Sequence, residues 1–165
     1  MEHTELNTKL KKIKLFKSLD VDFFNKFTPN LSIIHYNHGH EIITEGDAGG
    51  DMYLLLDGTV RVVKKTMSGE HYTAAILKSE NGIFFGEVGL LSEEKRSASV
   101  IAESRCELAK LNSQRFNEFI EQYPEYGVKI LRELSISICQ KLQKSNHDMI
   151  VLYEALIGEI GHSFL

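Results

Sequence analysis

The sequence predicts a mainly β domain, an antiparallel sandwich or barrel of short strands between two helical regions. Three observations predict it. Short apolar runs follow one another closely between about residues 31 and 112, glycine-bearing turns separate them, and no segment long enough for a crossover helix interrupts them. Strands joined without crossover helices pair antiparallel and close into a sandwich or barrel.

The first 30 residues are predicted to be helical. Leu10, Ile13 and Phe16 recur every third residue, which is typical of the buried stripe of an amphipathic helix. Asp20 is placed to cap a second short helix. That helix would turn three aromatic residues inward, Phe23, Phe24 and Phe27. Lysines surround the first stripe, but solvated lysines around a stripe docked on the core are more common than a membrane-binding helix, so no membrane contact is predicted.

The central region is divided into strands by its turn residues. The predicted strands are Leu31–Tyr36, Glu41–Thr44, Met52–Leu56, Thr59–Lys65, His71–Leu77, Ala98–Ala102 and Cys106–Leu111. Asp57 and Gly58 stand between two apolar runs and predict a hairpin, because both residue types tolerate positive φ. Ser68 and Gly69 give a weaker signal of the same kind.

The last region, Ser113 to Leu165, is predicted to be helical again. Asn112 or Ser113 can cap a helix that runs to about Gln122, and Pro124 stands where the first turn of the next helix would begin. A further apolar pattern repeats at an average of 3.5 residues, the coiled-coil period. Its members are Leu142, Ser145, Met149, Leu152 and Leu156. The pattern lasts about two heptads and favours self-association over a helix packed on its own barrel.

Composition excludes several classes of protein. The 165 residues carry a net charge of −4, so the chain lacks the broad basic field of a protein that binds nucleic acid directly. No apolar stretch approaches the roughly 20 residues of a membrane span, and the polar start shows no secretion signal. Cys106 and Cys139 form no ligand pattern and are expected to be reduced, buried thiols. A cytoplasmic location is therefore expected.

Two segments contain more glycine and charged residues than strands and turns alone require. The first, residues 42–58, places glycines and aspartates in a tight loop, which by itself indicates only turn geometry. The second, residues 84–98, combines Gly86 and Gly89, which let a ligand approach the backbone, with Glu87 and Arg96. One helical turn over Glu87 to Leu91 would offer free N–H groups to an anion.

Carboxylate and arginine around small residues suit a ribose phosphate. Arg96 can form a charge-assisted pair with a phosphate, and Glu87 can accept hydrogen bonds from sugar hydroxyls. The spacing is equally compatible with a salt bridge between Glu87 and Arg96 over an ordinary turn. From the residues alone, both interpretations stay open.

Both segments resemble the signature patterns of the cyclic nucleotide-binding domain family. The second segment fills the family pattern with Phe85, Gly86, Glu87, Gly89, Leu90, Arg96, Ser97 and Ala98. In the first, the second acid of the loop, Asp51, comes one place later than the pattern expects; the family's loop makes no essential ligand contact. With the flanking helices, the resemblance covers nearly the whole chain.

The resemblance implies an eight-stranded, jelly-roll-like antiparallel β-roll flanked by N-terminal helices and a long C-terminal helix. It implies one domain over residues 1–165, with helices in 1–30, the β-roll in 31–112 and dimerising helices in 113–165. Glu87 would bind the ribose 2′-hydroxyl, and Arg96 and Ser97 the cyclic phosphate. The other implied contacts are Val62 at the base and, around the cassette, Phe85, Gly86, Val88, Gly89 and Ala98.

The C-terminal helix resembles the dimerising helix of bacterial catabolite activator proteins. An alignment on Lys141, Leu142 and Gln143 puts Ser145 and Asn146 where that helix supplies polar contacts to the adenine edge. Ser145 is the polar member of the apolar 3.5-residue pattern. The alternative is that its small side chain only lets two helices approach closely.

The implied function is a non-catalytic sensor that binds a cyclic nucleotide and transmits occupancy through its C-terminal helices. Cyclic AMP is favoured over cyclic GMP, no cofactor is expected, and a homodimer through the C-terminal helix is predicted. The 53 residues after Asn112 are expected to be used by two helices, so the output would pass to an unknown downstream protein or through assembly. The alternative is a protein-interaction module that keeps the fold and binds no nucleotide.

Other chemistry has little support in the sequence. His35, His38 and His40 are closely spaced, but the partners that a metal-binding barrel would need are missing, so no metal site is predicted. No nucleophile stands in a glycine-shaped elbow with a base, so the chain is predicted not to be an enzyme.

Overall fold

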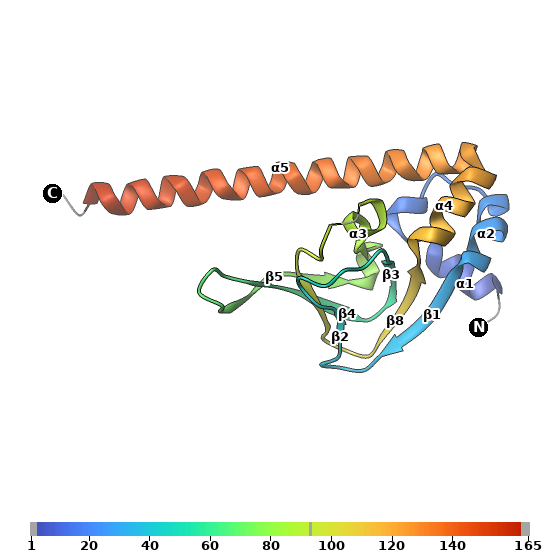
Figure 1. Cartoon of the computed structure of the whole chain (residues 1–165), viewed down its shortest axis with the longest axis horizontal. Coiled ribbons are helices and arrows are strands. Elements are labelled where there is room, and N and C mark those ends of the chain that lie inside the picture. The colour runs from blue at the N-terminus through green and yellow to red at the C-terminus, as the bar shows by residue number, and fades with distance from the viewer. Residues whose placement is uncertain (1–2, 93, 163–165) are drawn as a thin grey trace. The chain divides into compact units, whose positions relative to one another are not determined.

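The computed structural model describes residues 3–92 and 94–162, and the chain divides into two compact units, Met1–Val128 and Lys129–Leu165. Within the described residues, the first unit contains two four-stranded antiparallel sheets with short helices (Figure 1). The mainly β fold and the β-roll flanked by helices are thus confirmed.

The first sheet has the strand order β1-β8-β3-β6. Its strands are β1 (Leu31–Tyr36), β8 (Cys106–Leu111), β3 (Met52–Asp57) and β6 (Phe84–Phe85). Leu31 lies opposite Leu111 at one end of the β1–β8 ladder, and Met52 lies opposite the same leucine from the other side. The two-residue strand β6 was not predicted, because an apolar run this short carries no periodicity.

The second sheet has the order β2-β7-β4-β5. Its strands are β2 (Glu41–Ile43), β7 (Ser99–Ala102), β4 (Thr59–Lys65) and β5 (His71–Lys78). The predicted bounds differ by one residue at most in this sheet. Gly58, between β3 and β4, has φ +96°, and a Cβ there would lie 2.5 Å from the Arg105 carbonyl oxygen, so the predicted turn requires glycine.

The core lies between the two sheets and is almost wholly apolar. Both sheets contribute side chains that are nearly excluded from solvent. They are Ile42, Ile43, Tyr53, Leu55, Val60, Phe85, Val100, Ala102, Cys106 and Leu108. The segment that carries Phe85 is thereby anchored in the core immediately before the glycine-rich stretch, so the core fixes where that stretch begins.

Three α-helices gather at one end of the sheets (Figure 1). They are α1 (His3–Leu10), α2 (Val21–Phe27) and α4 (Ser113–Gln122), with 3₁₀ turns at Lys14–Phe16, Thr28–Asn30 and Ser79–Asn81. Asp20 caps α2 as predicted, since its Oδ1 accepts a hydrogen bond from the Phe23 amide at 2.9 Å. Buried rings join these elements, with Phe23 stacked on Phe27 at 4.8 Å and Phe27 edge-on to Phe119 at 5.0 Å.

Two sequence expectations are wrong in detail. The stripe Leu10, Ile13, Phe16 is buried, but α1 ends at Leu10 and the last of these residues lies in a 3₁₀ turn. Cys106 is buried and donates to the Thr59 carbonyl at 3.2 Å, whereas Cys139 is exposed. A lone thiol in a helix has no spacing signal that separates a buried from an exposed face.

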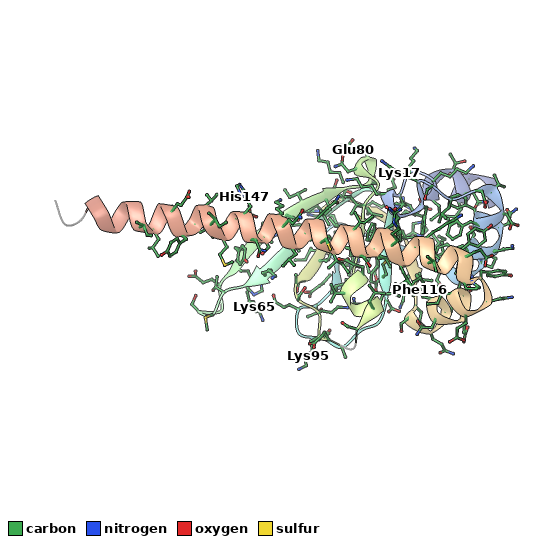
Figure 2. The ribbon with its side chains drawn as sticks, turned by 90° about the horizontal axis from the view of Figure 1, so that it is seen from above. Lys17, Lys65, Glu80, Lys95, Phe116 and His147 are labelled. Atoms are coloured by element: carbon green, nitrogen blue, oxygen red, sulfur yellow. The ribbon has the colours of Figure 1, made fainter. Side chains whose placement is uncertain are left out.

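The helix α5 (Pro124–His162) begins in the first unit, and its residues from Lys129 on form the second unit. Pro124 opens it, as predicted. Figure 2 shows one uninterrupted helix with side chains such as His147 projecting from it, and every side chain from Cys139 to Gly158 is exposed. None of the helices formed by residues 3–92 and 94–162 combines the length and apolar character needed to cross a membrane.

Candidate functional site

The glycine-rich stretch after β6 forms a compact turn of helix. Gly86 has φ +80° and leads into α3 (Glu87–Leu91), so the helical turn predicted over these five residues is confirmed. Glycine is needed at this entry, because a Cβ on residue 86 would lie 2.8 Å from the Asp51 carbonyl oxygen. A loop then leads from α3 back to β7 and carries Arg96.

The Arg96 side chain is held by two backbone carbonyls. Its Nη1 donates to the Gly86 oxygen at 3.1 Å, and its Nη2 donates to the Asp51 oxygen at 2.7 Å. Its own backbone is fixed by hydrogen bonds with Asp47 and Gly46, both at 2.9 Å. The two side-chain bonds use two of the five N–H groups of a guanidinium, so a side chain held in this way can still donate to an anion.

Three glycines surround the Arg96 guanidinium. A Cβ on Gly49 would lie 3.0 Å from both Nε and Nη2, and a Cβ on Gly89 would lie 2.5 Å from Nη1. The same Cβ on Gly89 would collide with the Gly49 carbonyl oxygen. At these glycine positions a side chain does not fit beside the cation, so backbone peptide groups border the guanidinium there.

Asp51 connects the arginine to strand β8 and to the N-cap of α4. Its backbone oxygen accepts from Arg96, while its carboxylate lies 2.7 Å from Lys110 Nζ and accepts from Asn112 Nδ2 at 3.2 Å. The hydrogen bond from the ammonium to Asp51 raises the pKa of Lys110. Asn112 is also the N-cap of α4, since its side chain accepts from the Gln114 amide at 2.8 Å.

The same loop packs directly on the start of α4. A Cβ on Gly50 would lie 2.6 Å from Ser113 Oγ and 3.6 Å from the Gly89 oxygen. The residues 49–51 thus lie between the arginine side of the site and the first residue of a helix. The loop therefore contacts both the Arg96 guanidinium and the start of α4.

Apolar side chains flank the glycine turn. Phe85 is buried and stacks on Tyr53 with ring centroids 5.5 Å apart, and burial raises the pKa of Tyr53. Val88 is exposed on α3, whereas Glu87 beside it is only 4% exposed.

The remaining predicted residues are spread over several elements. Ser97 is exposed and Ala98 half-buried in the stretch that follows Arg96, and Val62 is half-buried on β4. Ser145 and Asn146 lie exposed on α5, in the second unit. The predicted roles of all these residues stay predictions.

The clustered histidines have local partners. His38 Nδ1 lies 2.8 Å from the Glu103 carbonyl oxygen, and His40 Nδ1 accepts from the Asn37 amide at 3.3 Å. His35 Nε2 is 4.0 Å from a Glu107 carboxylate oxygen. Among the residues that the structure describes, no three His, Cys, Asp or Glu side chains are grouped so as to hold a metal ion.

The sequence did not identify Gly49, Asp51 or Asn112 as part of the site. The loop of residues 46–51 is expected from the sequence to matter only as a turn, yet it supplies a carbonyl to Arg96 and a carboxylate to Lys110. Every residue type has a backbone carbonyl, so a hydrogen bond to that group cannot be predicted from the residue type. The usable signal was the unusual run Gly49-Gly50-Asp51 immediately before β3.

Comparison with known proteins places these features in one family. Residues 33–123 match the family model described as "Cyclic nucleotide-binding domain". The chain is 34% identical over 110 residues to the potassium/sodium hyperpolarization-activated cyclic nucleotide-gated channel 2 of Mus musculus. The alignment covers 67% of this chain but only 12% of that channel, so the chain corresponds to a small part of such relatives.

Solved structures show the same architecture. The Thermus thermophilus catabolite activator protein superposes with a TM-score of 0.75 at 27% identity, over 84% of this chain and 62% of that one. A cyclic nucleotide-binding domain from Methylobacillus flagellatus superposes with a TM-score of 0.78 at 24% identity, over 90% and 82% of the two chains. At that identity, the second likeness concerns the fold alone.

Proposed function

Since this chain belongs to the cyclic nucleotide-binding domain family, we propose that it is a non-catalytic sensor that binds a cyclic nucleoside monophosphate at Arg96 and Glu87. The observation that carries the proposal is the guanidinium held among Gly49, Gly86 and Gly89. An arginine fixed by carbonyls and bordered by bare backbone is preorganised for a small anion, because little side-chain entropy is lost when the anion binds.

The other contacts follow from the chemistry of a ribose cyclic phosphate. Glu87, as a buried carboxylate, accepts hydrogen bonds from the 2′-hydroxyl, and Ser97 donates to the phosphate beside Arg96. The remaining proposed contacts are Val62, Phe85, Gly86, Val88, Gly89 and Ala98. Ser145 and Asn146 on α5 would reach the base.

Occupancy would be transmitted to the helices after β8. The loop of residues 49–51 contacts Arg96 on one side and Asn112 and Ser113 on the other. A ligand can shift a protein between two conformations only if it binds them with different affinities. The hydrogen bonds from Arg96 to the backbone carbonyls are the ones that a bound phosphate would rearrange. We infer that α4 and α5 carry the signal and that α5 pairs with a second copy.

Cyclic AMP is the proposed ligand, with cyclic GMP as the alternative. The likeness to a bacterial catabolite activator protein supports the first, and Ser97 after the arginine is compatible with either. Parallel titrations decide between them: a lower dissociation constant for cyclic GMP would reverse the choice of base without affecting the proposed phosphate site.

The test of the proposal is the change Arg96→Ala. Removing the partner of a desolvated phosphate costs about 2–5 kcal/mol, so cyclic AMP should bind roughly 30-fold to several thousand-fold more weakly. The control is Arg115→Ala, which removes the same charge from an exposed position on α4 and should leave the affinity unchanged. Isothermal titration calorimetry measures both.

An interaction module that binds no nucleotide is the second candidate. It is favoured by the two carbonyl bonds of Arg96, which are compatible with a purely structural arginine. In that case Arg96→Ala would lower the melting temperature, and neither cyclic nucleotide would give heat with the unmodified chain. A cytoplasmic location is proposed for either function, and cell fractionation tests it.

A further inference from the structure

The C-terminal part of α5 is apolar on more of its surface than one helix pair can cover. Between Met149 and Ile157 the only charged residue is Glu154. Seven large apolar side chains in this stretch are exposed. They are Met149, Ile150, Val151, Leu152, Tyr153, Leu156 and Ile157. A contiguous exposed apolar surface of this kind marks an interaction site.

The angular positions of these residues give the shape of the surface. At about 100° per residue, the arc from Leu152 through Leu156, Met149, Tyr153 and Ile157 to Ile150 spans about 160° of the helix. A strict coiled-coil seam of a and d positions is a narrower stripe. The arc has the width of the apolar face of a helix in a bundle.

The arc consists of two adjoining stripes. The first is the predicted seam, and the second is formed by Ile150, Tyr153 and Ile157. Towards the N-terminus the second stripe would continue through Asn146 and Gln143, which are polar. The extra apolar surface is therefore confined to the last part of the helix and is continuous with the seam there.

The seam by itself is a poor two-stranded interface. It lasts about two heptads, fewer than the three or four that characterise a coiled coil. Its a positions, Leu142, Met149 and Leu156, lack the β-branched residues that favour two strands, and a serine, Ser145, occupies one d position. The second stripe, with Ile150 55%, Tyr153 63% and Ile157 51% exposed, would add apolar contact beside this short seam.

We propose that four copies of this chain associate through the C-terminal part of α5, two seam-paired helices packing on another two through Ile150, Tyr153 and Ile157. The occupant of the second stripe is thus the same stripe on a second pair. The proposal goes beyond the sensor function and rests on it only in sharing the seam, since the four-helix contact involves no nucleotide-binding residue of the first unit.

The test compares three forms of the full chain by sedimentation equilibrium over a range of concentrations. The unmodified chain should sediment as a tetramer. The triple change Ile150→Gln, Tyr153→Gln, Ile157→Gln should give a dimer, because glutamine keeps the helix and removes the apolar stripe. The matched control, Lys144→Gln, His147→Gln, Val151→Gln, lies on the opposite face and should stay tetrameric.

Other outcomes overturn the proposal. An unmodified chain that is monomeric or dimeric at every concentration contradicts it, and so does a stripe variant that remains tetrameric or falls directly to monomers. The seam variant Leu142→Glu, Leu152→Glu should give monomers. Circular dichroism verifies that each variant keeps its helix, and cyclic AMP titration, done separately, shows whether the sensor function fails independently of assembly.

Discussion

Gly89 illustrates how one missing side chain shapes the proposed ligand site. A Cβ at this position would lie 2.5 Å from Arg96 Nη1 and would collide with the Gly49 carbonyl oxygen. Arg96 Nη1 cannot move away without straining its hydrogen bond to the Gly86 oxygen. The absence of a side chain at Gly89 therefore affects both the packing of the loop and the position of the Arg96 guanidinium.

The change Gly89→Ala should lower both stability and nucleotide affinity. Overpacking of this kind costs about 1–3 kcal/mol. Urea unfolding and calorimetric titration with cyclic AMP measure the two effects. Gly158→Ala is the control, because nothing lies within 4 Å of a Cβ there and alanine favours a helix by about 1 kcal/mol. Unchanged affinity in Gly89→Ala would contradict the placement of the ligand beside Arg96.

Tyr126 ties the first turn of α5 to α2 at the residue scale. Its hydroxyl lies 3.1 Å from Asp20 Oδ1 and 3.0 Å from Asp22 Oδ2, so its single proton serves two carboxylates. Burial, followed by these hydrogen bonds, raises the pKa of Tyr126 well above its ordinary value. The pKa of Asp22 is lowered, first by Lys26 and then by Tyr126.

The raised pKa predicts a loss of stability in alkali. As the pH rises above about 10, the unfolded chain releases the Tyr126 proton while the folded chain keeps it, so the free energy of unfolding falls. Urea unfolding of Tyr126→Phe should show a smaller decline between pH 8 and 11 than the unmodified chain. Exposed Tyr72→Phe is the control. Equal declines in all three proteins would contradict the contact.

At the scale of elements, the loop of residues 46–51 joins the proposed ligand site to α4. The change Asp51→Asn keeps the backbone carbonyl but removes the charge that pairs with Lys110, so the loop should hold Arg96 less firmly. We expect cyclic AMP affinity to fall by about 1.5–2 kcal/mol, the lower part of the range for a hydrogen bond to a charged group.

Amide hydrogen exchange at Gln114 should also become faster in Asp51→Asn, because the N-cap Asn112 would then donate to a neutral amide oxygen, a weaker acceptor than the carboxylate that positions it. The control is Asp57→Asn, an exposed residue of the β3–β4 turn that tolerates asparagine. Exchange and affinity that match the unmodified chain would show that the loop does not couple the two elements.

The elements themselves are largely predictable from the sequence, for reasons that differ between them. The strands β1, β4 and β8 have apolar runs bounded by turn residues, and the structure gives them the predicted bounds. The N-terminal helix is shorter than its stripe predicts, because the Lys14 amide bonds the Gly82 carbonyl at 3.0 Å, a tertiary contact that interrupts the period-three stripe. Propensity and period contain no information about such a contact.

Some residues of the candidate site can be predicted from the sequence and others cannot, because tertiary contacts leave no pattern in the sequence. Gly86, Glu87, Gly89 and Arg96 stand out in the sequence because their side chains, or the lack of one, carry the chemistry. Asp51 is predicted only as a turn residue, although its carbonyl receives Arg96 and its carboxylate reaches α4. A sequence pattern records side chains, so contacts made through the backbone are visible only in the structure.

At the scale of the whole molecule, the proposed phosphate site and the proposed assembly surface lie in different units of the chain. The first unit contains the β-roll and the proposed phosphate site, and the second unit is a helix with an exposed apolar arc. A protein with a net charge of −4 can bind an anionic nucleotide, because Arg96 and the local peptide groups, rather than the total charge, set the field at the site.

Isothermal titration of the full chain with cyclic AMP is the direct test of whether this chain binds a cyclic nucleotide. We expect saturable heat with one nucleotide per chain, lost in Arg96→Ala and retained in Arg115→Ala. An absence of heat and of thermal stabilisation at millimolar cyclic AMP and cyclic GMP, with the folded chain verified by circular dichroism, would contradict the proposed binding.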